Sequence, residues 1–446
     1  MALGKREESE QLSFLMPDSL PKSPGHPFYQ KLNSLLAEAD FDHWLECRCE
    51  EYYADGGRPG IPPGVYIRML LVGYFEGIQS QRGIAWRCSD SLSIRSFLGL
   101  PIDKESPEHS SLTRVRKRLP LEVHEEVFSM VLTLAIEKKL LKGKTVAVDS
   151  TTLEADAAMK SIVRKDSGED YKEYLRRLSE EEGLEDPTDE DLRRFDKKRK
   201  GKKTSNAEWK STTDPDSRIT RMKDGRTHLA YKAENTVDLD TDLVLSANVY
   251  HGDHADNDSL TISLVTAQKN LIECGSEAAI EEVVADKGYH KTETLADLDT
   301  IGVRSYVPEP ERKHRRRWKG KPESHQDAVY ANRRRVRGKR SRRLQRKRSE
   351  LVERTFAHMC ATGGGRRSWL RGVEKVTKRY LVLAAARNLG VILRSIFGIG
   401  TARSLQGGMG GLFGHIRAAW LSIGAHLRHM DRIERKMTIS VIKLAS

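Results

Sequence analysis

Hydrophobic residues repeat with helical spacing through the first third of the chain. Pro62-Pro63 can begin a helix, because the first helical positions need no amide donor. A stripe of apolar residues then recurs at helical intervals and predicts one buried face, formed by Ile67, Leu70, Leu71, Tyr74, Phe75 and Ile78. The segment His109 to Ser111 offers N-cap side chains for a second helix, and Pro120 begins a third. We therefore expect an all-α domain over residues 27–140, after a flexible polar lead-in over residues 1–26.

Strand-like patterns begin at Thr145. The apolar run from Thr145 to Val148 is typical of a buried strand, and segments 227–237 and 243–250 alternate around a polar turn as a hairpin. Two further strand segments, 281–285 and 303–307, are separated by helical patterns. Because strands alternate with helices, we predict an α/β domain with a mixed sheet over residues 141–400.

Two charged segments interrupt this domain. Residues 166–196 are strongly acidic and are followed at once by a run of lysines and arginine, which predicts a solvated helical insertion over about residues 160–225. A basic arm follows at about residues 311–348. Helical patterns then return, and the glycine-rich residues 401–446 form a loosely specified tail.

The positive charge of the chain is concentrated in the basic arm. The net charge is +13, whereas residues 312–348 alone hold 18 Lys/Arg and two acids, a net of +16, so the remainder is near −3. Arginine pairs bidentately with phosphate, and Trp318 and Tyr330 within the arm can stack on unpaired bases. A solvated charged face is the plain alternative. We favour contact with DNA.

Other classes of protein are disfavoured. Five cysteines in 446 residues do not make a disulfide framework, which favours reduced thiols and a cytoplasmic location. The N-terminal residues carry no apolar signal segment. The apolar stretch 380–399 is interrupted by Arg387 and Arg394, so we expect no membrane span.

Three acids are candidate catalytic and metal-binding residues. Asp149 and Asp286 each end a short apolar run, and an acid at a strand end lies within reach of ligands. Glu353 lies in a helical segment beside the predicted buried stripe, on a partly enclosed surface, whereas Glu350 aligns with a solvated charged face. Three such acids can hold two Mg²⁺ or Mn²⁺ ions for phosphoryl transfer. Either aspartate alone would more simply be a helix cap or a turn residue.

Two histidine-containing clusters suggest zinc, but other interpretations are favoured. The segment His251 to Asp256 has no cysteine, and a polar loop that caps the next helix explains it better. His43 lies near Cys47 and Cys49, but there is no second cysteine pair, so we interpret this cluster as helix packing.

The segments around the three acids resemble the catalytic blocks of DDE transposases from bacterial insertion sequences. They read VAVDSTTLEA from Val146, VADKGYH from Val284 and LVERTFAH from Leu351. Two linking stretches, 224–232 and 330–335, also fit. The resemblance covers roughly residues 27–405, and the three blocks together are specific.

This resemblance implies an RNase H-like catalytic fold and a helical N-terminal domain that binds the terminal inverted repeats of the element. It implies that Asp149 bridges two metal ions, while Asp286 and Glu353 each complete one. Hydrolysis would free a 3′-OH at each element end, and that hydroxyl would attack target DNA. A bacterial, nucleoid-associated protein that forms at least a dimer, to pair two DNA ends, is also implied.

Basic residues from three segments are candidates for DNA contact: Arg333, Arg334, Arg335, Arg366, Arg367, Arg114, Arg116 and Lys117. The first three belong to the basic arm. The next two follow a glycine turn and fit either a phosphate clamp or an ordinary surface. The last three fit either a recognition helix or a basic surface helix. Lys287, Tyr289 and His358 lie near the acids in sequence, so positioning roles are a weaker prediction.

Two other functions remain beside a DNA transposase. One is a metal-dependent nuclease of the same fold that cuts DNA without joining strands. The other is a DNA-binding regulator whose catalytic domain is inactive.

Overall fold

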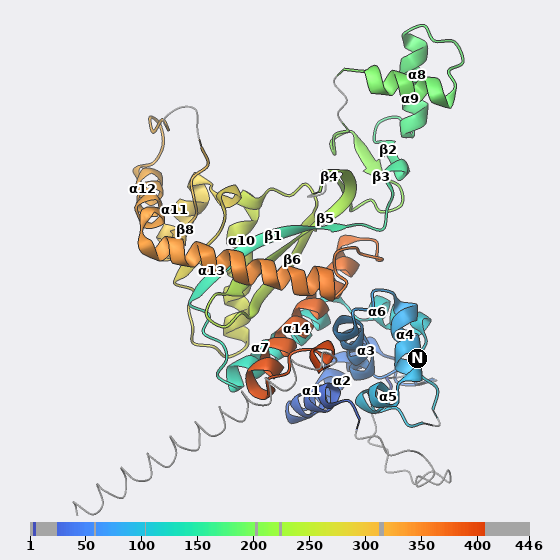
Figure 1. The fold of residues 1–446 in the computed structure, drawn as a ribbon, viewed down its shortest axis with the longest axis vertical. Helices are drawn as coiled ribbons and strands as arrows, with labels where there is room; N and C mark the ends of the chain where they lie inside the picture. The colour runs from blue at the N-terminus through green and yellow to red at the C-terminus, as the bar shows by residue number, and fades with distance from the viewer. Residues whose placement is uncertain are drawn as a thin grey trace, which may run out of the picture.

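The computed structural model describes residues 3–5, 25–57, 59–102, 104–200, 204–222, 225–311 and 316–405. Most of the predicted lead-in, the start of the basic arm and the tail beyond residue 405 lie outside the described residues. The described chain forms a helical N-terminal region followed by a region with a mixed sheet (Figure 1). This is the fold class that the hydrophobic pattern predicts.

The N-terminal region is a bundle of helices: α1 (Pro27–Glu38), α2 (Phe41–Cys49), η2 (Glu50–Tyr52), α3 (Pro63–Glu76), α4 (Gln81–Asp90), α5 (Leu92–Leu98), α6 (His109–Arg118) and α7 (Leu121–Glu137). Helix α3 is buried on all sides rather than along one face, because it is surrounded by α2, α4, α5, α6 and α14 (Val373–Phe397). Helix α6 begins at His109, but Glu108 is its N-cap and makes no side-chain cap bond. The predicted serine cap is therefore not formed.

A fully buried arginine ties the bundle together. The Arg68 guanidinium donates to the Asp42 carboxylate at 2.7 Å, to the Asn33 amide oxygen at 2.8 Å and to the Phe97 carbonyl at 3.0 Å. A buried charge is tolerated when it is both paired and hydrogen-bonded, and this set meets both conditions.

The described residues contain a six-stranded mixed sheet in the order β4-β5-β1-β7-β8, with β6 also paired to β5. Its strands are β1 (Thr145–Glu154), β4 (Arg218–Arg221), β5 (Thr227–Asp238), β6 (Val244–His251), β7 (Glu282–Val284) and β8 (Arg304–Tyr306). Strand β1 is antiparallel to β5 and parallel to β7, and β7 is parallel to β8. The β5–β6 hairpin, β7 and β8 were predicted from the sequence, whereas β4 was not.

Strand β1 corrects the predicted position of Asp149. The apolar run indicated a strand that ends at this residue, but β1 continues to Glu154 because β5 pairs with it as far as Glu154↔Ala230. Asp149 therefore lies in the middle of β1, where the apolar half of the strand gives way to a polar half. Asp286 follows the end of β7, as predicted.

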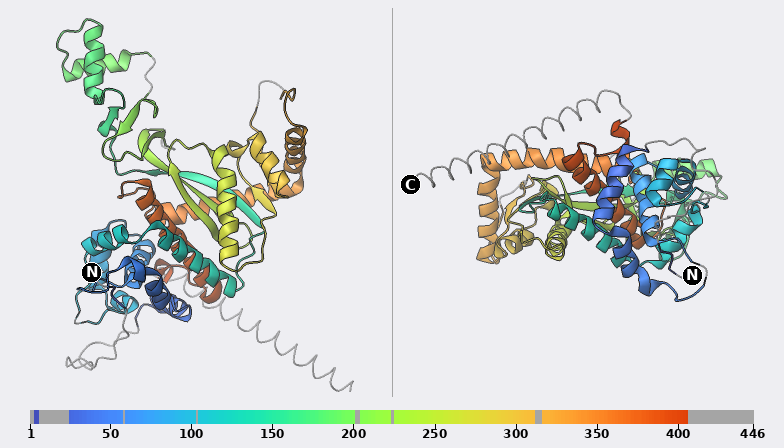
Figure 2. Two further views of the ribbon diagram at one scale, coloured as in Figure 1. Left: turned by 180° about the vertical axis from the view of Figure 1, so that it is seen from behind. Right: turned by 90° about the horizontal axis from the view of Figure 1, so that it is seen from below.

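Helices cover both faces of the sheet. Side chains alternate along a strand, and on β1 Ser150 contacts Asp256 of α10 (Asp256–Glu273), whereas Asp149 contacts Arg348 of α13 (Lys339–Phe356). Helices α10 and α13 therefore lie on opposite faces, as the two opposed views show (Figures 1 and 2). Helix α11 (Thr292–Thr300) packs beside β8 and α12 (Glu323–Arg337).

The charged insertion projects from the sheet (Figures 1 and 2). Its elements are η3 (Met159–Ser161), β2 (Ile162–Arg164), α8 (Tyr171–Glu181), α9 (Asp189–Lys198) and β3 (Trp209–Ser211). Trp209 is buried against the rings of Tyr171 and Tyr174, with centroids 5.5 and 5.3 Å away. The helices were predicted, and the β2–β3 ribbon was not.

The described part of the basic arm is helical and packed against the sheet region. It forms α12 (Glu323–Arg337) and the first half of α13, which meet at Gly338. Buried Asn332 of α12 donates to the Val307 carbonyl at 2.8 Å and accepts from the Val307 amide at 3.1 Å. This pair of bonds fixes α12 to the end of β8. Helix α13 begins at Lys339, so it starts within the predicted basic arm and not after it.

Three elements follow α13: a π-helical turn η5 (Ala357–Thr362), the long helix α14 (Val373–Phe397) and η6 (Ala402–Leu405). By length and composition alone α14 could cross a membrane, but 78% of its most apolar window is buried inside the molecule. It packs against α3, α7 and β6. Helix α14 therefore joins the N-terminal bundle to the sheet.

Candidate active site

Asp149 and Asp286 lie on neighbouring parallel strands at the same level. The β1–β7 register runs from Thr145↔Glu282 to Ala147↔Val284. Continued by two positions, the same register sets Asp149 beside Asp286, and the backbone of Asp286 is still extended, with φ −80° and ψ 179°. One pair of strands thus brings two aspartate positions that are 137 apart in sequence to the same level of the sheet.

The Asp149 carboxylate forms an ion pair with an arginine of α13. Asp149 Oδ2 accepts from Nη1 of Arg348 at 2.5 Å, and Oδ1 accepts from the Ser150 amide at 2.8 Å. The two side chains are 16% and 23% exposed for Arg348 and Asp149, so water screens the pair only in part. A charge-assisted bond of this length is a strong one. Nothing in the sequence pattern pointed to Arg348 as a residue of the site.

Asp286 has an acidic neighbour that sequence reasoning treated only as a helix cap. Its Oδ1 accepts from the Gly288 amide at 2.8 Å and so caps the short turn η4 (Lys287–Tyr289). A Cβ placed on Gly288 would lie 3.0 Å from Asp286 Oδ1 and 3.1 Å from Asp256 Oδ2. The two carboxylates therefore flank Gly288 closely, and any side chain at this position would press against both.

Glu353 is placed differently from the prediction. It is exposed on α13 and its Oε1 accepts from the Ser349 hydroxyl at 3.0 Å. The buried face of the helix, with Leu351, Val352 and Thr355, is on the other side. The predicted partly enclosed setting is therefore wrong. In the described ranges, no three His, Cys, Asp or Glu side chains are grouped as a metal site would require.

A buried polar network supports the strands from the α10 face. Glu234 accepts from the hydroxyls of Ser259 at 2.6 Å and Tyr289 at 2.7 Å. Burial, followed by the charge of Glu234, raises the pKa of Tyr289 far above its ordinary value, so its hydroxyl stays a donor. Lys232 Nζ lies 2.7 Å from Asp256 Oδ1, which also accepts from Ser150 at 2.9 Å. The network fixes the strand positions on either side of Asp149.

The other predicted supporting residues are placed less directly. Lys287 is exposed. Burial, followed by the charges of Arg387 and Arg394, lowers the pKa of His358. His251 Nδ1 lies 2.7 Å from the Asp216 carbonyl oxygen, and the His254 ring stacks on Tyr250 with centroids 4.7 Å apart.

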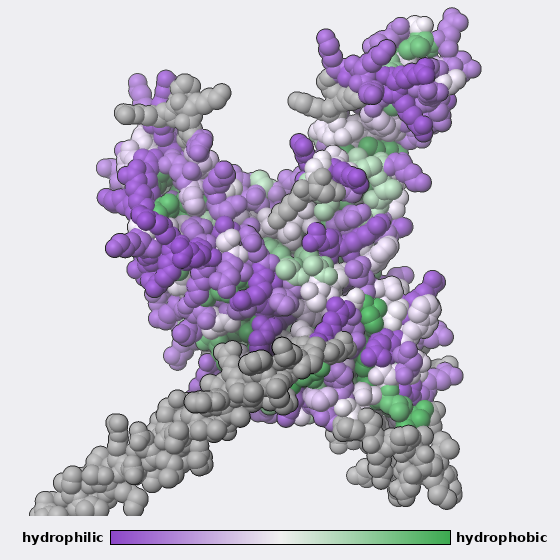
Figure 3. Space-filling view, in the orientation of Figure 1, coloured by the Kyte–Doolittle hydropathy of each residue, from purple (hydrophilic) through white to green (hydrophobic). Residues whose placement is uncertain are grey.

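The arginines of α12 have unequal surroundings. Arg333 pairs with Glu309 at 2.7 Å, and Arg335 donates to the Ser305 carbonyl at 3.0 Å, so both help to hold α12 in place. Arg334 between them is exposed. Hydrophilic residues gather over α12 and α13 (Figure 3). Exposed arginines on this surface, rather than all three predicted ones, have guanidinium groups available for phosphate.

Arg366 and Arg367 lie at the far end of β1 from the aspartates. The Arg366 carbonyl accepts from the Glu154 amide at 2.9 Å, and Arg367 Nη1 lies 3.7 Å from Glu154 Oε1. Five residues of extended strand separate Glu154 from Asp149, which is roughly 16 Å. At that separation the two arginines can reach a phosphate that flanks the cleavage position, but not a scissile phosphate beside the aspartates.

The basic residues of the predicted recognition helix also differ in exposure, as those of α12 do. Arg114 and Lys117 of α6 are exposed, whereas Arg116 is only 8% exposed and lines a cavity between α6 and α14. Arg116 cannot reach a DNA groove from that position. The sequence spacing did not distinguish these neighbours, because all three carry the same charge on one short helix.

Two segments of the chain match family models of transposases. A transposase domain model (DUF772) matches residues 18–118, and a transposase DDE domain model matches residues 309–393. No curated protein matches the chain. The two matches support an insertion-sequence DDE transposase family, and with it a DNA-acting enzyme. Glu353 lies inside the second match, whereas Asp149 and Asp286 lie between the two.

Proposed function

We propose that the protein is a DNA transposase that cuts at the ends of an insertion sequence and joins the freed 3′-OH to target DNA. The observation that carries this proposal is the parallel register that sets Asp149 beside Asp286, in a chain with transposase family matches on either side. The mixed sheet agrees with the RNase H-like fold that the resemblance implies.

Mg²⁺ or Mn²⁺ fits the residues present. Both aspartates are partly buried and offer hard oxygen donors, and Mg²⁺ commonly binds through one or two carboxylates together with substrate phosphates and water. Asp149 and Asp286 would hold the ions, with Glu353 as the third ligand. When bound, the ions stabilise developing charge and activate an oxygen nucleophile.

Residues of the chain itself perform the remaining tasks. Strands β1 and β7 hold the two aspartates in register, and the Lys232–Asp256–Ser150 contacts fix β1 from the opposite face. Arg348 holds Asp149 until a cation and DNA replace it. Exposed basic groups, namely Arg114, Lys117, Arg334, Arg366 and Arg367, would bind phosphates along the DNA.

Neutral variants of the three acids test the proposal. We expect Asp149→Asn, Asp286→Asn and Glu353→Gln each to reduce cleavage of a terminal-repeat duplex with Mg²⁺ by at least about a hundredfold, since even indirect metal partners are worth 10–100-fold. Glu350→Gln is the matched control, because Glu350 is an exposed acid on the same helix. Equal activity of Glu353→Gln and Glu350→Gln would remove Glu353 from the site.

A second assay separates joining from cutting. With pre-cut terminal-repeat DNA, Mg²⁺ and a target duplex, we expect a strand-transfer product. Cutting of intact DNA without this product would indicate the nuclease. Full DNA binding with no reaction in an otherwise active preparation would indicate the inactive regulator.

We also propose that two copies assemble on DNA to pair the element ends, in the cytoplasm of a bacterium at its nucleoid. Sedimentation of the protein with one and with two terminal-repeat duplexes would measure the assembly. A complex that holds one chain and one duplex at every ratio would contradict it.

A further inference from the structure

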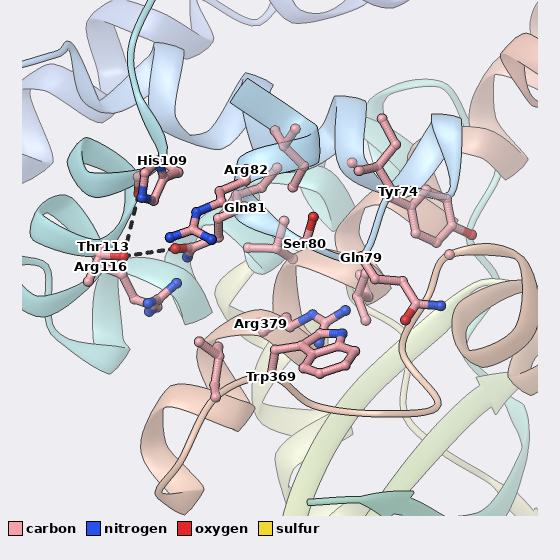
Figure 4. Close-up of a pocket in the computed structure, with 18 of the residues that line it drawn as sticks. Tyr74, Gln79, Ser80, Gln81, Arg82, His109, Thr113, Arg116, Trp369 and Arg379 are labelled. Carbon is pink, nitrogen blue, oxygen red and sulfur yellow. Dashed lines mark hydrogen bonds between the residues drawn. The ribbon is translucent and has the colours of Figure 1, made fainter. Parts of the chain in front are cut away.

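A cavity of about 520 Å³ lies between the N-terminal bundle and the segment that follows the π-helical turn. Helices α3, α4 and α6 form one side, and Gly363, Trp369, Leu370 and α14 form the other (Figure 4). Its size falls within the range of small-molecule sites, which is about 300–1,000 Å³. The catalytic aspartates do not line it.

Three arginines line this cavity, and within the described part of the chain none of them has a carboxylate partner; Arg82 is exposed, whereas the other two are more buried. Arg116 comes from α6 and Arg379 from α14. The Nε of Arg116 is buried without a hydrogen-bond partner, and the rest of its guanidinium faces the neutral amide of Gln81. Arg379 donates to the carbonyls of Arg367 at 3.0 Å and Gly364 at 2.7 Å. Both cations are thus held by neutral groups only.

The electrostatics of these arginines call for an anion. Burial, followed by the nearby charge of Arg116, lowers the pKa of Arg379 to about 10. Burial also lowers the pKa of Arg116. Like charges in a partly desolvated site are unfavourable unless a counter-charge joins them. A phosphate supplies that charge, and guanidinium groups match its geometry.

The remaining walls are partly polar, with Gln79, Ser80, His109 and Thr113, and partly apolar and aromatic. Tyr74, Ile78, Leu370 and Leu383 line the cavity, and the indole of Trp369 is 48% exposed beside Arg379 (Figure 4). The Arg367 guanidinium lies over one face of this indole, 4.7 Å from its ring, and so fixes its orientation. A bare phosphate would leave these walls uncovered, whereas a nucleobase would stack on an aromatic ring.

We propose that this cavity binds one nucleoside phosphate unit, with its phosphate between Arg116 and Arg379 and its base against Trp369. The unit can come from a free mononucleotide or from an unpaired position in bound DNA. Only the second source rests on the proposed transposase function. Trp369 lies just beyond Arg366 and Arg367, where a DNA strand that follows β1 away from the aspartates would arrive.

Fluorescence of 2-aminopurine tests both sources, because this base is quenched when it stacks on an indole. The full-length protein is titrated, without divalent ions, against 2-aminopurine deoxyribonucleoside, its 5′-monophosphate, and a duplex that carries 2-aminopurine at one unpaired position. We expect quenching by the wild-type protein with the monophosphate, the duplex or both, and weaker binding of the nucleoside. Quenching with the monophosphate alone identifies a free nucleotide as the ligand.

Two variants and one control decide the assignment. Trp369→Ala should abolish the quenching, whereas Trp86→Ala should not, because Trp86 is 70% exposed and does not line the cavity. Arg116→Gln should reduce binding of the monophosphate by at least about tenfold, to the level of the nucleoside, without changing the nucleoside itself. Quenching that persists in Trp369→Ala, or no quenching of either phosphate-bearing probe, would overturn the proposal.

The test is independent of catalysis. Asp149→Asn should quench as the wild type does. Quenching without any cleavage in Mg²⁺ would contradict the transposase proposal and leave the cavity assignment standing. Cleavage without quenching would contradict the cavity assignment and leave the transposase proposal standing.

Discussion

Arg348 occupies the carboxylate that the proposed reaction needs. Its partner Asp149 is 199 positions away in sequence, so the contact exists only because α13 crosses the face of β1. An arginine held on an aspartate by a 2.5 Å bond competes directly with a metal ion for the same oxygen. The ion pair balances the charge of Asp149.

Removing this competitor should strengthen metal binding. We expect Arg348→Gln to tighten the affinity for Mn²⁺, measured by calorimetry, by roughly three- to tenfold, since such a pair is worth about 1 kcal/mol. Arg346→Gln is the control, because it removes the same charge from an exposed position on the same helix. Equal affinities for the two variants would show that Arg348 does not occupy the metal position.

At the scale of elements, α7 places a histidine in the bundle core, where it contacts a tyrosine of α3. His124 is 1% exposed; its Nε2 lies 3.3 Å from the Tyr66 hydroxyl and its Nδ1 lies 3.0 Å from the Pro120 carbonyl oxygen. Burial lowers the pKa of His124 to about 4. In the unfolded chain the pKa of this imidazole is near its ordinary value of 6.5. Between pH 6.5 and pH 4 the unfolded chain therefore binds a proton at His124, whereas the folded bundle does not.

This histidine should make the bundle less stable in acid. The contribution of neutral His124 to the free energy of unfolding is fully present above pH 6.5. It is lost as the pH falls towards 4, by up to about 3 kcal/mol. We expect His124→Gln to flatten the change in denaturation midpoint between pH 7 and pH 5, relative to the wild type. The same pH dependence in both proteins would show that His124 is protonated in the fold.

Local patterns predicted most elements but not their partners. The helices α7 and α10 and the β5–β6 hairpin follow from periodicity and turn residues. The sequence pattern predicted that strand β1 ends at Asp149, although it continues to Glu154. Its second half is half-exposed and depends on pairing with β5, so no apolar run marks it. Helices α12 and α13 were described as an arm because charge dominates their composition. The Arg348 contact, Asp256 beside Asp286 and the buried Arg116 depend on tertiary packing, which no local pattern encodes.

At the scale of the whole molecule, Asp242 joins three parts of the fold. It lies in the β5–β6 turn with φ 66°, and its Oδ2 lies 2.7 Å from Nη2 of Arg387 on α14 and 3.0 Å from Nη2 of Arg354 on α13. Arg387 is only 3% exposed. The helix that bridges to the N-terminal bundle and the helix that carries Glu353 are thus tied to the same hairpin.

Loss of this charge should destabilise the sheet region. We expect Asp242→Asn to lower the free energy of unfolding by roughly 3 kcal/mol, because it leaves a buried arginine unpaired. Asp240→Asn in the same turn removes only an exposed pair with Lys347 and should cost less than about 1 kcal/mol. Chemical denaturation of both variants measures the difference, and equal losses would contradict the assigned role of Asp242.

The central claim is that Asp286, set beside Asp149 by the sheet, binds the divalent ion that drives DNA cleavage. A thiolate ligand binds softer ions such as Mn²⁺ better than it binds Mg²⁺. Cleavage by Asp286→Cys should therefore be lost in Mg²⁺ and recover by at least about tenfold in Mn²⁺, while Asp286→Ala recovers in neither. If Asp286→Cys and Asp286→Ala respond alike to both ions, or if either keeps wild-type activity in Mg²⁺, the claim is wrong.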